Sequence, residues 1–107
     1  MKYNKLVRDR IPDIIMEDNR EPKTRILSEK EFITELERKL REECEEVIAA
    51  GDGDTAEHRL EELGDVLEVM LALAKIDHFS LDDIVFAAEQ KRKKRGGFDK
   101  RIYLIED

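Results

Sequence analysis

The sequence predicts an all-α fold, a helical hairpin or bundle that is completed by oligomerisation. Charged residues make up 44% of the 107 residues and aromatic residues only 6%, a balance typical of helices with solvated faces. Two long segments with apolar residues at helical spacing flank a Gly-Asp-Gly break at 51–53. A small helical unit that must also hold a cavity often completes its core with further copies, so we expect a homo-oligomer.

Length, cysteine content and apolar runs limit the class of protein further. At 107 residues we expect one domain, 1–107. Cys44 is the only cysteine, so no intrachain disulfide can form and a reducing cytoplasm is the expected location. No apolar run approaches the length of a membrane span, and the first ten residues lack an apolar signal region, so we expect no membrane partner.

The charge is unevenly distributed along the chain. The net charge is −7, but residues 91–101 hold seven Lys/Arg and one Asp, which leaves −13 for the remainder. Binding to a nucleic-acid polymer needs a broad positive face, so we do not expect it. An acidic body with one basic end fits a site where carboxylates hold a metal and basic residues meet a polyanion.

The N-terminal third predicts a short helix, an extended piece and the start of a long helix. Pro12 suits the first turn of a helix through residues 14–16. Residues 24–27 are expected to be extended. Ser28 followed by Glu31 forms a capping box, which predicts that the first long helix opens there.

The apolar stripe of this long helix contains an acid. Glu43 follows Leu36 by seven residues, which places it within roughly 20° of the same direction at 100° per residue. Glu46 lies on the border of the stripe, while Glu42 and Glu45 face solvent. The stripe itself consists of Phe32, Leu36, Leu40, Val47 and Ile48.

The second long helix is expected to be the central element. Asp54 with Glu57 is a plausible cap, and the helix runs to about Asp77. Its second half, 66–76, is apolar on every face, which predicts burial on every face. Glu62 and Asp65 lie in line with residues of this apolar half.

The C-terminal third predicts a final helix and an extended tail. Ser80 with Asp83 starts the helix, and Gly96-Gly97 ends it after the basic run. The tail at 101–105 can pair with residues 24–27 as a small two-stranded ribbon.

Two acid pairs at i, i+3, Glu43/Glu46 and Glu62/Asp65, predict a metal site. Residues three apart share a helix face, and an antiparallel hairpin would bring the four carboxylates together. Acids at this spacing also arise by chance among 27 acidic residues, but an unpaired buried carboxylate costs several kcal/mol, roughly, unless a cation compensates. Four hard oxygen donors suit Mg²⁺ or a similar divalent cation.

Other polar residues have simpler explanations. Cations at a helix C-terminus complement the helix dipole, which can account for the run at 91–95, although one or two of these residues can also bind phosphate. His58 and His78 lack a partner at metal-ligand spacing and are expected at the surface. Cys44 is expected to be a packing residue.

The acidic motifs resemble those of a known superfamily. EECEE at 42–46 followed by EELGD at 61–65 is similar to the EExxE…ExxD signature of the all-α nucleoside triphosphate pyrophosphohydrolases. That superfamily includes the MazG-like enzymes, the dimeric dUTPases and phosphoribosyl-ATP pyrophosphohydrolase. YNKLVRDRIP at 3–12 and KRGGFDKRIYL at 94–104 resemble the ends of short, single-domain MazG-like members.

The resemblance implies hydrolysis of an NTP or dNTP to a monophosphate and pyrophosphate, with house-cleaning of non-canonical nucleotides as the expected role. It implies Mg²⁺, or Mn²⁺, and a dimer or tetramer. Glu42 and Glu43 are implied as catalytic, with Glu42 contacting a second metal or a water. The implied metal ligands are Glu43, Glu46, Glu62 and Asp65. The residues expected to bind the substrate phosphates are Lys39, Lys91, Lys94, Arg95, Lys5 and Arg8.

Three alternatives remain open. The first is a catalytically silent helical oligomer that binds a nucleotide or a partner protein. The second is a structural acidic bundle whose carboxylates pair with Lys and Arg. The third is a phosphoribosyl-ATP pyrophosphohydrolase, which shares the chemistry and differs in substrate.

Overall fold

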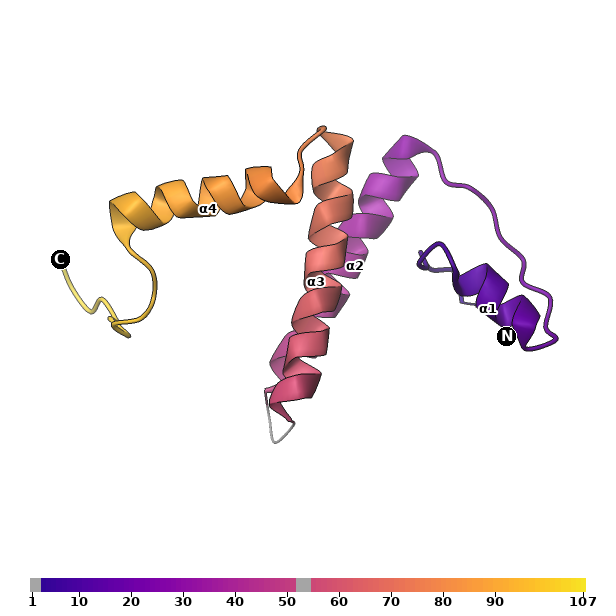
Figure 1. The fold of residues 1–107 in the computed structure, drawn as a ribbon, viewed down its shortest axis with the longest axis horizontal. Helices are drawn as coiled ribbons and strands as arrows, with labels where there is room; N and C mark the ends of the chain where they lie inside the picture. The colour runs from indigo at the N-terminus through magenta and orange to yellow at the C-terminus, as the bar shows by residue number, and fades with distance from the viewer. Residues whose placement is uncertain (1–2, 52–54) are drawn as a thin grey trace. The chain divides into compact units, whose positions relative to one another are not determined.

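The computed structural model describes residues 3–51 and 55–107, and within them it contains four α-helices and no strand (Figure 1). The helices are α1 (Ile11–Glu17), α2 (Glu29–Ala50), α3 (Ala56–Ile76) and α4 (Leu81–Arg95). The predicted all-α class is confirmed. The chain divides into two compact units, Met1–Leu73 and Ala74–Asp107. That residues 1–107 function as one domain stays a prediction.

The N-terminus of α2 is fixed by the predicted capping box. The Ser28 hydroxyl accepts a hydrogen bond from the Glu31 backbone N–H, and the Glu31 carboxylate accepts one from the Ser28 N–H. Arg25 adds a two-pronged ion pair, with Nη1 and Nη2 at 3.2 and 2.8 Å from the two Glu31 oxygens. The Arg25 hydrogen bonds, with that from Ser28, lower the pKa of Glu31 to about 2.

Helices α2 and α3 run antiparallel as a hairpin (Figure 1). At the start of α3, the Thr55 hydroxyl accepts a hydrogen bond from the His58 backbone N–H at 3.1 Å. Thr55 therefore occupies the capping position; the expected cap Asp54 lies outside the described residues.

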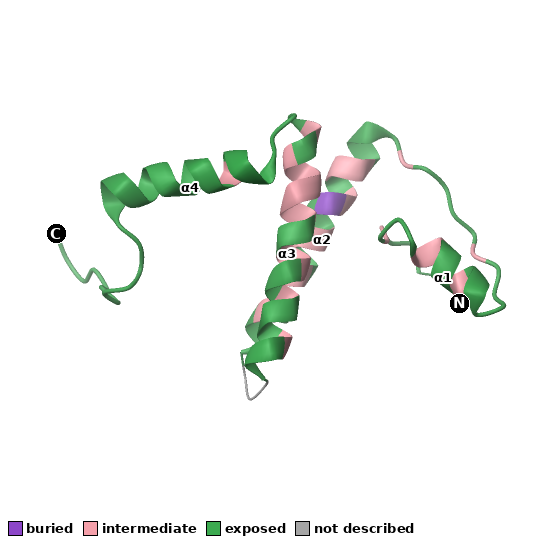
Figure 2. Ribbon diagram, viewed as in Figure 1, coloured by how far each residue is buried: buried purple, intermediate pink, exposed green. Residues whose placement is uncertain are grey.

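The hairpin buries little apolar surface. Among the described residues only Leu36 and Ala50 are buried (Figure 2). The apolar half of α3, predicted to be buried on every face, is half-buried at most positions and exposed at Leu67. Two helices can cover only one face of each other, so the other faces of α3 stay open in a single chain.

The C-terminal unit contains α4 and the tail. Ser80 and Asp83 form the predicted capping box, and Gly96, at a φ of 81°, ends the helix as predicted. The predicted ribbon is wrong, because neither 24–27 nor 101–105 forms a strand. Arg101 has a left-handed φ of 59°, which interrupts an extended chain. An isolated two-stranded ribbon is also marginal in water.

Within the described part of the chain, none of the helices combines the length and the apolar character that crossing a membrane requires.

Candidate metal centre

Four carboxylates from the α2–α3 hairpin meet at one place. The pairs Glu43/Glu46 on α2 and Glu62/Asp65 on α3 each lie one helical turn apart, so both acids of a pair face the same side. One oxygen from each carboxylate lies within 4.8 Å of the others. We call these four residues the acidic cluster.

Two members of the acidic cluster have little contact with solvent. Only 12% of the Glu43 side chain and 15% of the Glu62 side chain are exposed. Their Oε2 atoms are buried, and neither has a hydrogen-bond partner in the described part of the chain. A buried oxygen without a partner destabilises the fold. The cluster therefore has unsatisfied acceptors on both helices.

Three side-chain nitrogens each contact one oxygen of Glu43, Glu62 or Asp65. Lys39 Nζ lies 3.6 Å from Glu43 Oε1. His58 Nε2 lies 3.0 Å from Glu62 Oε1. Both contacts follow from the i, i+4 spacing on a helix.

The third donor comes from outside the hairpin. Arg8, in the segment before α1, donates from Nη2 to Asp65 Oδ1 at 2.7 Å. Lys39 and Arg8 were both predicted to hold substrate phosphates. In the structure each contacts a carboxylate of the acidic cluster.

The pKa of the Glu43 carboxyl is raised above its ordinary value. Burial is the main cause, and the negative charges of Glu46 and Asp65 raise the pKa further, while Lys39 opposes them. Proton and metal would compete for this oxygen. A nearby divalent cation reverses the effect of burial, since it favours the ionised carboxylate.

The donor set fits a hard divalent cation. Carboxylate oxygens from four side chains match the ligand preference of Mg²⁺ and Mn²⁺. The partnerless Oε2 atoms of Glu43 and Glu62 are acceptors that such a cation would satisfy. That these residues are ligands stays a prediction.

None of the other predicted site residues belongs to the acidic cluster. Glu42 is exposed on α2, next to Glu43 in sequence. Lys5 lies over the Tyr3 ring, with Nζ 5.6 Å from the ring centroid. Lys91, Lys94 and Arg95 belong to the separate C-terminal unit.

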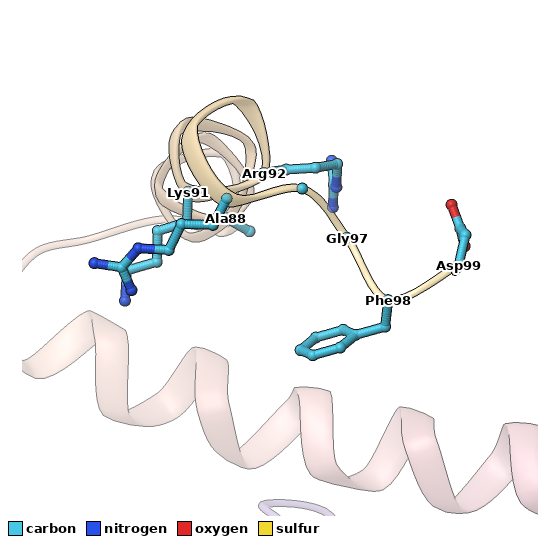
Figure 3. Close-up of a pocket in the computed structure, with 8 residues that line it drawn as sticks. Ala88, Lys91, Arg92, Gly97, Phe98 and Asp99 are labelled. Carbon is cyan, nitrogen blue, oxygen red and sulfur yellow. The ribbon is translucent and has the colours of Figure 1, made fainter. Parts of the chain in front are cut away.

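Some of the basic residues of α4 and the residues that follow this helix line an open pocket of about 760 Å³. Figure 3 shows the Phe98 ring turned toward the side where Lys91 lies, while Asp99 points away. Arg95 also lines this pocket, and Lys94 is not among its lining residues. A pocket with cations and one aromatic ring can accommodate a phosphorylated ligand.

The contact between His58 and Glu62 was not predicted from the sequence. His58 was expected at the surface without a partner, and its side chain is indeed partly exposed, but it contacts Glu62. Its place four residues before Glu62 was the available signal. No sequence pattern connects Arg8 with Asp65, because 57 positions separate them.

Comparisons with known proteins agree with the acidic motifs. The model of the MazG nucleotide pyrophosphohydrolase domain matches residues 33–97, more than half of the chain and the whole acidic cluster. Among curated proteins, the uncharacterized protein YabN of Bacillus subtilis (strain 168) is 38% identical over 58 residues. That stretch makes up 50% of this chain and 12% of YabN. No solved structure matches the chain. The chain belongs to the MazG nucleotide pyrophosphohydrolase domain family.

Proposed function

We propose that this chain is a metal-dependent nucleoside triphosphate pyrophosphohydrolase. The observation that carries the proposal is the acidic cluster, whose four carboxylates converge within 4.8 Å in a chain of the MazG family. Two of these acids present buried oxygens without a partner. A structural acidic bundle would pair such oxygens, so this alternative is less favoured.

Glu43, Glu46, Glu62 and Asp65 are proposed to hold Mg²⁺ or Mn²⁺. The bound cation supplies charge neutralisation at the triphosphate and lowers the pKa of a coordinated water. In the overall reaction, a water oxygen bonds to the α-phosphorus as the α–β phosphoanhydride bond breaks. The products are a nucleoside monophosphate and pyrophosphate.

The other side chains are proposed to orient substrate and water. Glu42 is exposed and precedes Glu43 in the sequence, and it is proposed to accept a proton from the attacking water. Negative charge builds on the leaving pyrophosphate, and cationic side chains stabilise it. The residues proposed for this role are Lys39, Lys91, Lys94, Arg95, Lys5 and Arg8.

We also propose that the active form is a homo-oligomer. One chain leaves the apolar half of α3 half-buried, and Leu60, Leu63 and Leu67 are exposed on the same helix. A second copy packed on these side chains would bury them and stabilise the hairpin. Analytical ultracentrifugation should give a dimer or tetramer; a monomer at micromolar concentration would contradict this part of the proposal.

The function is tested by measuring pyrophosphate and monophosphate released from a panel of substrates. The panel contains canonical and damaged NTPs and dNTPs together with phosphoribosyl-ATP, each with Mg²⁺ and with chelator. We expect metal-dependent release, strongest for non-canonical nucleotides if the role is house-cleaning. Nucleotide binding without any release across the panel would instead support the silent-oligomer alternative.

A further inference from the structure

Arg8 joins the N-terminal segment to the acidic cluster. Its ion pair with Asp65 links residues 57 positions apart. The Arg8 carbonyl also accepts a hydrogen bond from the Ile11 backbone N–H at 3.0 Å, at the start of α1. The contact therefore connects the beginning of α1 with one carboxylate of the cluster on α3.

Arg8 differs from the other donors in how it is held. Lys39 and His58 sit on the same helices as the acids that they contact, one turn away. Their distance from the acidic cluster is fixed by the helix. Arg8 lies on a non-helical segment outside the hairpin, so it can leave Asp65 without disturbing α2 or α3.

The electrostatics of the cluster account for the contact. Four carboxylates within 4.8 Å repel one another when ionised. A guanidinium at 2.7 Å offsets part of that charge at Asp65. A divalent cation carries twice the charge and can contact several carboxylates at once, so it should replace a partly exposed arginine.

We propose that Arg8 is a built-in counter-cation, which pairs with Asp65 in the metal-free protein and gives up this contact when a divalent cation binds. The inference rests on the proposed metal site and adds a regulatory element to it. Metal loading then releases residues 3–10 from the hairpin. Arg8 thereby lowers the affinity of the cluster for metal and couples that affinity to the state of the N-terminal segment.

Metal affinity gives the first test. Mn²⁺ alone is titrated calorimetrically into the full chain as wild type, Arg8→Gln and Arg20→Gln. Arg20 is a matched control because it pairs locally with Asp18 at 3.2 Å and its side chain is 60% exposed, against 59% for Arg8. We expect Arg8→Gln to bind Mn²⁺ about two- to fivefold more tightly than wild type, the range of an exposed ion pair. Arg8→Lys, which keeps the charge, should stay close to wild type.

Hydrogen exchange of residues 3–10 gives a second readout that does not depend on activity. In wild type, exchange in this segment should rise when Mn²⁺ is added. In Arg8→Gln it should already be fast without metal, whereas Arg20→Gln should respond as wild type does.

The outcomes separate this inference from the proposed function. Weaker Mn²⁺ binding by Arg8→Gln would mean that Arg8 orients Asp65 as a ligand, and it would overturn the inference. Equal affinity in wild type and Arg8→Gln would overturn it as well. In both cases the metal site itself would stand. Absence of Mn²⁺ binding in wild type would overturn the metal site and, with it, the role of Arg8.

Discussion

The acidic cluster of the α2–α3 hairpin and the basic residues of the C-terminal unit differ in how far their side chains are brought together. In the hairpin, four carboxylates converge, and two of them are largely buried. In the C-terminal unit, the basic residues from 91 to 101 are all exposed, and only some of them line an open pocket. Helical spacing on two packed helices can assemble acidic ligands in advance. Long basic side chains stay solvated until an anion orders them.

The largest effect on activity is expected in the hairpin, where the four carboxylates already lie together. Glu43→Gln should lower metal-dependent pyrophosphate release by roughly 100-fold or more, since even residues that only support metal ligands cost 10–100-fold. Glu45→Gln is the control, because Glu45 is an exposed acid on the same helix. Both variants are compared by steady-state assay after circular dichroism has established equal helix content. Wild-type turnover by Glu43→Gln would exclude Glu43 as a ligand.

Substitution of a basic residue in the C-terminal unit should have a smaller effect, and the effect should be on KM. Lys91→Ala should raise KM for a nucleoside triphosphate about tenfold, since a charge-assisted hydrogen bond is worth roughly 1.5–3 kcal/mol. The metal dependence should not change. Lys100→Ala removes the same charge from the same unit but not from the pocket lining, and it should leave KM within about twofold. Equal effects of the two substitutions would indicate a diffuse electrostatic contribution in place of a defined contact.

The same contrast explains what the sequence could predict. The four helices followed from capping boxes, a proline in a first turn, periodicity and helix-ending glycines, which are local signals. The meeting of two acid pairs followed from two short-range facts, the i, i+3 spacing and the short break between antiparallel helices. All of these depend on residues close together in the chain.

Features that depend on distant residues were not predictable. The Arg8–Asp65 pair needs the path of the N-terminal segment, which no periodicity encodes. The two-stranded ribbon failed because it required two distant segments to pair, and the left-handed Arg101 does not suit a strand. The apolar half of α3 predicted more burial than one chain provides.

A smaller effect concerns the stability of the metal-free hairpin. The pKa of Glu43 is raised by burial and by its acidic neighbours, so its contribution to stability is present below the ordinary pKa of 4.5 and is lost as pH rises through the raised pKa. Glutamine mimics the protonated acid. With chelator at pH 7, the melting temperature of Glu43→Gln should lie roughly a few degrees above that of wild type, and this difference should vanish at pH 4.

With saturating Mg²⁺, wild type should melt at a higher temperature than Glu43→Gln, because the cation stabilises only the protein that binds it. Scanning fluorimetry of wild type, Glu43→Gln and Glu45→Gln measures the difference in melting temperature with chelator and with Mg²⁺ in one experiment. A lower melting temperature for Glu43→Gln in chelator at pH 7 would show that ionised Glu43 stabilises the metal-free fold, contrary to the expected repulsion.

The smallest effect is expected at the start of α2, where Arg25 pairs with the exposed Glu31. The Arg25 hydrogen bonds lower the pKa of Glu31 from 4.5 to about 2. Because the folded pKa lies below the ordinary value, this contribution is complete above pH 4.5 and is lost as pH falls toward 2. Arg25→Gln should move the Glu31 titration upward, measured from its side-chain NMR shifts. The variant should also lose less stability on acidification than wild type. An unchanged midpoint would mean that the Ser28 backbone N–H, which also donates to Glu31, holds the carboxylate without help from Arg25.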